Sequence, residues 1–266
     1  MKNILCICIF LFLASCSTLP NTKQIETKHG EYSYHISGKG DFTVVLESGM
    51  GDDMTSWEPV LNLLETDVQV FTYNRAGFSG SKSNSEQRDG ITIVKELKSL
   101  LHATEIKPPY ILIGHSLGGI YMQLFAKTYP DEVAGIILVD STYHGTEPLC
   151  QNADKSYCTD EIPSWAKYIY PNAVSGEYRV STLTLAQSRE NKGFPSVPLV
   201  VLSKGKPHKD IGEASDLWKQ QQKDQKTLTN LSPISKQIIC DKCGHYVHQD
   251  NPKLVKQALD WILGRM

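Results

Sequence analysis

The residues from Gly114 to Gly118, GHSLG, place a serine between two glycines with the spacing G-x-S-x-G. An apolar run, YILIG at 110–114, leads into them and predicts a strand, and residues 117–129 have the composition of a helix. In this setting the spacing is typical of a sharp strand-to-helix turn that exposes the serine hydroxyl. A hydroxyl is a weak nucleophile unaided, so Ser116 needs a base to take its proton and a carboxylate to orient that base.

A second stretch that could do chemistry is CDKCGH, at Cys240–His245. Its residue types suit a zinc site, a redox dithiol or a catalytic histidine. Structural zinc usually takes two closely spaced ligand pairs, and Cys150 and Cys158 are spaced too widely for the second pair. A redox C-x-x-C opens a helix, which the following residues do not predict. We therefore expect no metal, and we favour His245 as a base.

The elements that must position these residues alternate along the chain. The 266 residues, 40% hydrophobic and 21% charged, suit one globular domain. Very apolar strands separated by helices indicate an α/β fold, with a mostly parallel sheet covered by helices on both faces. The predicted strands are 32–36, 42–47, 68–74, 110–114, 135–140, 197–203 and 236–240, and the predicted helices are 57–64, 91–103, 117–129, 213–228 and 252–263.

The alternation stops at about residues 143–195, a polar stretch dotted with prolines and aromatic residues. We interpret this stretch as a cap inserted into the domain. Its Trp165, Tyr168 and Tyr170 suggest an apolar pocket wall, although aromatic residues in a cap serve equally well as packing.

The first residues form a different kind of segment. Lys2 and the apolar run at 4–14 have the charge and length of a signal peptide, and the run is too short to span a bilayer comfortably. Its end, LASC at 13–16, resembles the bacterial lipoprotein signal, in which the cysteine becomes the lipidated first residue. The resemblance implies an exported protein whose Cys16 carries the anchor, with residues 17–28 as a linker and 29–266 as the folded domain. Ser17, where aspartate would mark inner-membrane retention, favours the outer membrane; an ordinary secretory signal is the alternative.

The remaining cysteines suggest disulfides. Once Cys6 and Cys8 are assigned to the signal and Cys16 to the lipid, an even number is left in an exported protein, which favours two bridges. Three pairings are possible. The local pairing, Cys150 with Cys158 and Cys240 with Cys243, closes the shortest loops. The four candidates are Cys150, Cys158, Cys240 and Cys243.

From about Phe42 to its end, apart from the cap, the chain resembles the α/β-hydrolase family. The matching segments, in the family's order, are VVLESGMG, YNRAGFSGS, YILIGHSLGGIYMQLFAKTYPDEVAGIILVDS, VPLVVLS and GHYVHQDNPKLV. Two positions depart from the family pattern: Ser48 stands where many relatives have histidine, and Asn74 where many have aspartate. We expect the second departure to affect loop packing rather than chemistry.

The resemblance implies that Ser116 is the nucleophile and that the backbone N–H groups of Leu117 and Met50 form an oxyanion hole. The family's chain order, nucleophile then acid then base, makes His245 the base and leaves His248 at the surface or rim.

The acid has two candidate positions. Asp140 ends the strand GIILVD and fits the first position that the family uses. Asp210 lies beyond the next strand and could be reached by a longer loop. Asp140 is favoured, because His208 stands where an aspartate would be expected in the second position.

The expected function is hydrolysis of carboxylic esters through an acyl-enzyme, without a cofactor. Serine at the turn argues against the dehalogenase and epoxide hydrolase branches, which use aspartate there. Amide, peptide or thioester hydrolysis and acyl transfer use the same triad, and a non-catalytic lipid-anchored ligand-binding protein is a further alternative. The expected partners are a small-molecule ester or acyl substrate and, through the lipid, a membrane. A net charge of −2 without a basic block argues against nucleic acid, and the oligomeric state stays open.

Overall fold

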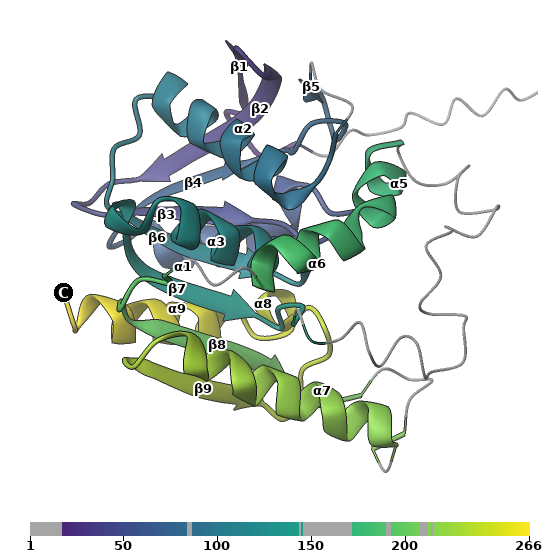
Figure 1. Cartoon of the computed structure of the whole chain (residues 1–266). Coiled ribbons are helices and arrows are strands. Elements are labelled where there is room, and N and C mark those ends of the chain that lie inside the picture. Colours follow the sequence, from purple (N-terminus) through teal and green to yellow (C-terminus); the bar gives the residue numbers. More distant parts are fainter. Residues whose placement is uncertain are drawn as a thin grey trace, which may run out of the picture.

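One sheet organises the molecule (Figure 1). The computed structural model describes residues 18–83, 87–143, 145, 172–189, 193–207, 212–213 and 215–266. The strand order is β1-β2-β4-β3-β6-β7-β8-β9, with β5 paired to β2. All pairs from β4 to β9 are parallel, whereas β2 runs antiparallel to β1, β4 and β5. The strands are β1 Lys23–Thr27, β2 Gly30–Gly38, β3 Thr43–Glu47, β4 Gln69–Tyr73, β5 Lys82–Ser83, β6 Tyr110–His115, β7 Val133–Val139, β8 Leu199–Lys204 and β9 Ser235–Cys240.

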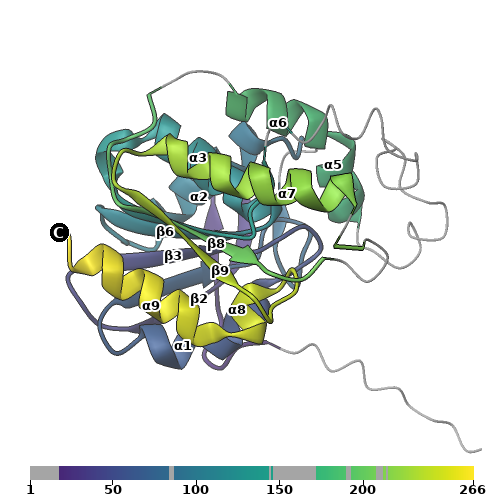
Figure 2. The ribbon, with the colours of Figure 1, turned by 90° about the horizontal axis from the view of Figure 1, so that it is seen from below.

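Helices cover both faces of the sheet, as Figure 2 shows with α2, α3, α6 and α7 on one side and α1, α8 and α9 on the other. Side chains of one strand alternate between the two faces: Val45 packs in the core under α2 and α3, and Val44 and Leu46 pack in the opposite core. The predicted α/β fold, with a mostly parallel covered sheet, is confirmed. The α-helices are α1 Glu58–Leu64, α2 Gly90–Ala103, α3 Leu117–Thr128, α5 Asn172–Arg179, α6 Ser181–Arg189, α7 Asp216–Thr227, α8 Val247–Asp250 and α9 Pro252–Leu263; the 3-10 helices are η1 Met54–Trp57, η2 Pro130–Glu132 and η5 Leu228–Leu231.

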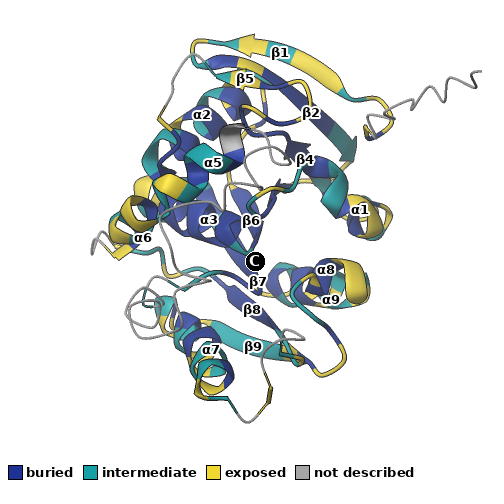
Figure 3. Cartoon of the chain, turned by 90° about the vertical axis from the view of Figure 1, so that its right-hand side faces the viewer, coloured by how far each residue is buried: buried dark blue, intermediate teal, exposed yellow. Residues whose placement is uncertain are grey.

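Residues 17–28 were predicted to be a linker, but Lys23–Thr27 within this range form β1 at the edge of the sheet. Three of the five residues of β1 are exposed, and they are drawn in yellow along this strand in Figure 3. An edge strand with a single half-buried apolar residue, Ile25, has too weak an alternation to predict a strand from sequence. None of the helices in the described ranges has the length and hydropathy of a bilayer-spanning segment.

Part of the predicted cap is helical. Helix α6 packs against α2 and α3. Thr184 Oγ1 accepts from the N–H of Gly90 at 3.0 Å, and Gln187 Oε1 accepts from the N–H of Ile91 at 3.1 Å, so α6 holds the first turn of α2. The aromatic cap residues Trp165, Tyr168 and Tyr170 lie outside the described residues, as do Cys16, Cys150, Cys158 and Asp210.

Candidate active site

Ser116 occupies the turn between β6 and α3 with φ 52° and ψ −121°, a conformation that L-residues rarely adopt. Its N–H donates to the carbonyl of Val139 at 3.1 Å, which ties the turn to β7. The flanking glycines are required by close backbone approach. A Cβ at Gly114 would lie 2.6 Å from the carbonyl oxygen of Gly118, and a Cβ at Gly118 would lie 2.5 Å from the carbonyl oxygens of Glu47 and Ser48. The local sequence therefore builds a strained turn that presents one hydroxyl.

Two further side chains meet Ser116 in a line. His245, in the loop after β9, places Nε2 2.9 Å from Ser116 Oγ and Nδ1 2.6 Å from Asp140 Oδ2. Asp140 directly follows β7 and also has a positive φ, 40°. An ionised carboxylate can only accept, so the proton lies on Nδ1 and leaves Nε2 to accept from the serine hydroxyl. The structure thus brings together the three residues that the sequence analysis had placed in one set.

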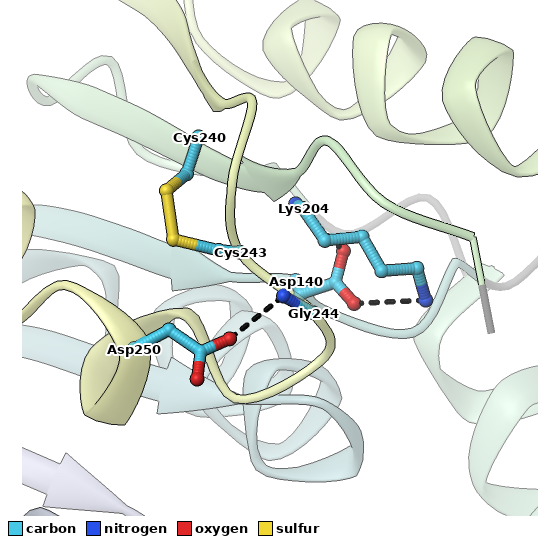
Figure 4. The surroundings of a disulfide bond; sticks show 6 residues. All are labelled: Asp140, Lys204, Cys240, Cys243, Gly244 and Asp250. Carbon is cyan, nitrogen blue, oxygen red and sulfur yellow. Dashed lines mark hydrogen bonds and ion pairs between the residues drawn. A yellow bond between two sulfur atoms is a disulfide. The ribbon is translucent and has the colours of Figure 1, made fainter. Parts of the chain in front are cut away.

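Lys204 is a partner of Asp140 that the sequence analysis missed. This residue ends β8, and its Nζ lies 3.1 Å from Asp140 Oδ2 while its backbone N–H donates to Oδ1 at 3.3 Å (Figure 4). Burial alone would raise the pKa of Asp140, but the hydrogen bond to His245 and the charge of Lys204 outweigh it and lower this pKa. Asp140 is therefore held as a carboxylate, which is the form that can orient an imidazole.

The loop that carries Met50 is held from behind by Arg75. Its guanidinium donates to the carbonyls of Ser48 at 2.7 Å and Gly49 at 2.8 Å. In a trans peptide the N–H points opposite to the carbonyl, so fixing the Gly49 carbonyl turns the N–H of Met50 away from Arg75. Leu117 begins α3, where a backbone N–H has no acceptor within the helix. Both expected oxyanion donors thus have backbones with a fixed orientation.

Arg75 is itself buried among carboxylates. It donates to Glu47 Oε1 at 2.7 Å and, through two nitrogens, to both oxygens of Glu177 on α5, at 2.7 and 3.0 Å. Tyr73 donates to the other oxygen of Glu47 at 2.6 Å. Burial is the largest influence on the pKa of Glu47 and raises it, against the effect of Arg75. This cluster links the described part of the cap to the Met50 loop.

Asn74, where many family members have aspartate, packs the neighbouring loops. Its Oδ1 accepts from the N–H of Met54 at 2.8 Å, and its Nδ2 donates to the carbonyl of Ser79 at 3.0 Å. The expectation that this position acts in loop packing is confirmed.

Two more histidines surround His245. His115 Nε2 lies 3.0 Å from the carbonyl oxygen of His245, and the His115 ring centroid lies 4.6 Å from those of both His245 and His248. The prediction of a surface or rim position for His248 is wrong, because its side chain is fully buried, with its ring 4.4 Å from that of Trp57. Burial first, and then the neighbouring histidines, lower the pKa of His248 to about 2, so this ring is neutral.

The loop that presents His245 carries a disulfide, Cys240 to Cys243, with Cα atoms 5.3 Å apart (Figure 4). Asp250 of α8 accepts from the N–H of Gly244 at 2.7 Å, and the carbonyl of Cys243 accepts from the N–H of Lys206 at 3.1 Å. The described residues contain no group of three or more histidine, cysteine or acidic side chains arranged to hold a metal ion. In this structure, CDKCGH forms a loop that is bridged by the Cys240–Cys243 disulfide and ends in His245.

One cavity lies beside the Met50 loop and a second is lined by members of the candidate site. The first, about 470 Å³, is lined by Gly51–Asp53, η1 residues, Phe78 and Ser79. The other, about 150 Å³, is lined by Asp140 and His245 themselves and by α7. The side chain of His245 is 41% exposed, whereas that of Asp140 is 3% exposed, so the imidazole is the part of the pair that a ligand can reach.

Comparisons with known proteins agree on the fold. A family model described as alpha/beta hydrolase fold matches residues 43–169. An uncharacterized protein of Bacillus subtilis (strain 168), YqjL, is 28% identical over 229 residues, which cover 86% of each chain. A thermophilic esterase from Thermogutta terrifontis is 17% identical with a TM-score of 0.63, and the match covers 92% of this chain and 98% of that one. An epoxide hydrolase mutant from Vigna radiata is 13% identical with a TM-score of 0.69, over the same shares of the two chains.

This chain therefore has the α/β-hydrolase fold. The two similar structures differ in activity, so the fold alone does not determine the reaction, which depends on the side chains of the site.

Proposed function

We propose that this protein is a serine hydrolase that cleaves carboxylic esters through an acyl-enzyme on Ser116. The observation that supports the proposal is the continuous line of hydrogen bonds from Ser116 Oγ through His245 to Asp140, at 2.9 and 2.6 Å, at a strained turn. A nucleophile, a base and an orienting acid within hydrogen-bond reach of one another are the geometric requirement for acyl transfer.

In the first half of the reaction, Ser116 Oγ attacks the ester carbonyl carbon while its proton passes to His245 Nε2. The carbonyl π pair moves to the oxygen, and the N–H groups of Leu117 and Met50 stabilise that charge. Asp140 stabilises the imidazolium that forms. When the intermediate collapses, the bond to the alcohol oxygen breaks and His245 gives that oxygen the proton, leaving an acyl-Ser116 ester.

In the second half, His245 takes a proton from water as the water oxygen attacks the acyl carbon. The bond to Ser116 then breaks, the serine recovers the proton from His245, and the carboxylic acid leaves. The balance is one ester and one water converted to one acid and one alcohol, with no redox change and no cofactor.

The test uses the purified protein with p-nitrophenyl esters of increasing acyl length, matched amide and thioester substrates, and a Ser116→Ala control. We expect turnover of esters that the Ser116→Ala protein lacks, and covalent labelling of Ser116 by a fluorophosphonate. Equal rates for the wild type and Ser116→Ala would refute the enzyme proposal and favour a ligand-binding role. Faster turnover of the amide or thioester would change the substrate class, and acyl transfer to an added alcohol in preference to water would indicate a transferase.

We also propose that the protein is exported and anchored by lipid on Cys16. The support is the LASC sequence at 13–16, and an acyl chain contributes about 0.8 kcal/mol per buried CH₂, so several chains hold a protein stably in a bilayer. We expect Cys16→Ala to move the protein from the membrane fraction to the soluble periplasmic fraction. Unchanged partitioning would show that the anchor lies elsewhere.

A further inference from the structure

The cavity beside Asp140 and His245 lies next to the nucleophile. Residues 141–143 form one wall, and the N–H of Thr142 donates to the carbonyl of Ser116 itself at 3.0 Å. Helix α7 forms the opposite wall with Gln221, Gln222, Asp224 and Gln225. His245 lines this cavity, and in the proposed reaction its imidazole protonates the leaving alcohol. A substrate group bound in the cavity would therefore belong to the alcohol half of the ester.

Three acceptor atoms on the α7 wall receive no hydrogen bond from the described residues. Asp224 Oδ2, Gln221 Oε1 and Gln225 Oε1 are buried, and none has a hydrogen-bond partner among the residues that the structure describes. The orientation of Gln225 is set, because its Nε2 donates to the carbonyl of Ser141 at 2.6 Å and so directs Oε1 elsewhere. Asp224 is 4% exposed, and Gln220 satisfies its Oδ1 at 2.8 Å while Oδ2 is left over.

Among the residues that the structure describes, no cation forms an ion pair with Asp224. Asp140 and Lys204 neutralise each other at 3.1 Å, which leaves the charge of Asp224 in the cavity wall without a described cation in contact. Burial raises the pKa of Asp224 and outweighs the hydrogen bond from Gln220 and the charge of Lys223, which both lower it. An unsatisfied buried polar group costs about 1–3 kcal/mol, and more when it is charged, so a donor that fills the gap gains that energy.

We propose that this cavity is a subsite for a primary ammonium group on the alcohol portion of the substrate, so that the preferred substrates are esters of amino alcohols. The inference rests on the ester hydrolysis proposed above. A primary ammonium has three N–H donors and no acceptor, which complements the three free acceptors on α7. The cavity of about 150 Å³ compares with a share of about 30 Å³ for one water in the liquid, so a short aminoalkyl chain fits.

The kinetic test compares two esters of nearly equal size, 4-aminobutyl butanoate and pentyl butanoate. We expect kcat/KM to favour the amino ester at least tenfold in the wild type, and this preference to fall to near one in Asp224→Asn. Asp216→Asn, at an exposed position on the same helix, is the matched control and should keep the wild-type preference. Because the readout is a ratio within each protein, a general loss of stability cancels. An equal preference in the wild type and Asp224→Asn overturns the subsite.

A binding measurement separates this proposal from the hydrolase proposal. In the Ser116→Ala protein, 4-amino-1-butanol should raise the Tm, and 1-pentanol should not. The rise should vanish in Ser116→Ala/Asp224→Asn and persist in Ser116→Ala/Asp216→Asn. If neither ester is hydrolysed but the amine still stabilises through Asp224, the subsite stands and the hydrolase proposal fails. If both esters are hydrolysed alike and the amine does not stabilise, only the subsite fails.

Discussion

At the residue scale, one carboxylate oxygen of Asp140 contacts both an imidazole and an ammonium group. Oδ2 of Asp140 lies 2.6 Å from His245 Nδ1 and 3.1 Å from Lys204 Nζ. The carboxylate therefore stays ionised although it is almost completely buried, and its direction is fixed from two sides. The ionisation and orientation of Asp140 thus depend on Lys204 at the end of β8 as well as on β7, which Asp140 follows.

For the acid itself, we expect Asp140→Asn to lower kcat by roughly 10⁴-fold, because an asparagine amide that donates to Nδ1 stabilises the wrong imidazole tautomer. Asp210→Asn is the control and should lose little activity. The measurement is ester turnover of both variants at equal concentration of folded protein. The reverse order of losses would show that the acid comes from the later loop.

At the element scale, α5 and the Met50 loop meet through Arg75. The guanidinium joins Glu177 of α5 to the carbonyls of Ser48 and Gly49, so a displacement of this helix moves the donors of the loop. The described part of the cap and the proposed oxyanion hole are therefore mechanically connected.

Removing this link should affect both stability and rate. We expect Glu177→Gln to cost about 1–3 kcal/mol in the free energy of unfolding, because a buried N–H of Arg75 loses its acceptor while Glu47 still balances the guanidinium charge. We also expect kcat to fall with little change in KM, because Arg75 then holds the Met50 loop less firmly. Arg179→Gln, exposed on the same helix, is the control and should change stability by no more than about 0.5 kcal/mol. Denaturant unfolding and steady-state kinetics measure the two effects, and a variant with wild-type kinetics would contradict the mechanical link.

The disulfide loop has a separate prediction at this scale. Cys240→Ala/Cys243→Ala should lower both the Tm and the ester turnover, because the bridge restrains residues 240–243, which lead into His245. Dithiothreitol under unfolding-permissive conditions should affect the wild type and leave the double variant unchanged. If dithiothreitol alters neither stability nor activity of the wild type, the bridge does not support the histidine loop.

At the scale of the whole molecule, the buried His248 makes folding sensitive to acid. Its folded-state pKa of about 2 lies far below the ordinary 6.5 that the unfolded chain has. Between these two values the unfolded state binds one more proton than the folded state, so stability falls as the pH drops from about 6.5. The maximal slope for one proton is about 1.4 kcal/mol per pH unit.

We therefore expect His248→Phe to lose about 2 kcal/mol less unfolding free energy than the wild type between pH 7 and pH 5. Phenylalanine keeps a flat ring beside Trp57. The measurement is urea unfolding at both pH values, and His102→Gln on the surface of α2 is the control with the wild-type slope. Parallel pH profiles for His248→Phe and the wild type would mean that this ring is not buried in its neutral form.

Much of the molecule was accessible from the sequence because it depends on local physics. The alternation of apolar strands and amphipathic helices follows from side-chain periodicity, and the turn at Ser116 follows from glycines where a Cβ would meet backbone. The edge strand β1 was missed, because its side chains are mostly exposed and its pattern is weak.

What the tertiary structure decided are contacts between residues far apart in the chain. Lys204 meets Asp140 across 64 positions and Arg75 meets Glu177 across 102, and nothing local marks either pair. His248 illustrates the same limit: it lies only three residues after the half-exposed His245, yet its ring is buried in the core against Trp57. Sequence periodicity determines which elements form, but the charge partners and the burial of a polar side chain are set only when those elements pack.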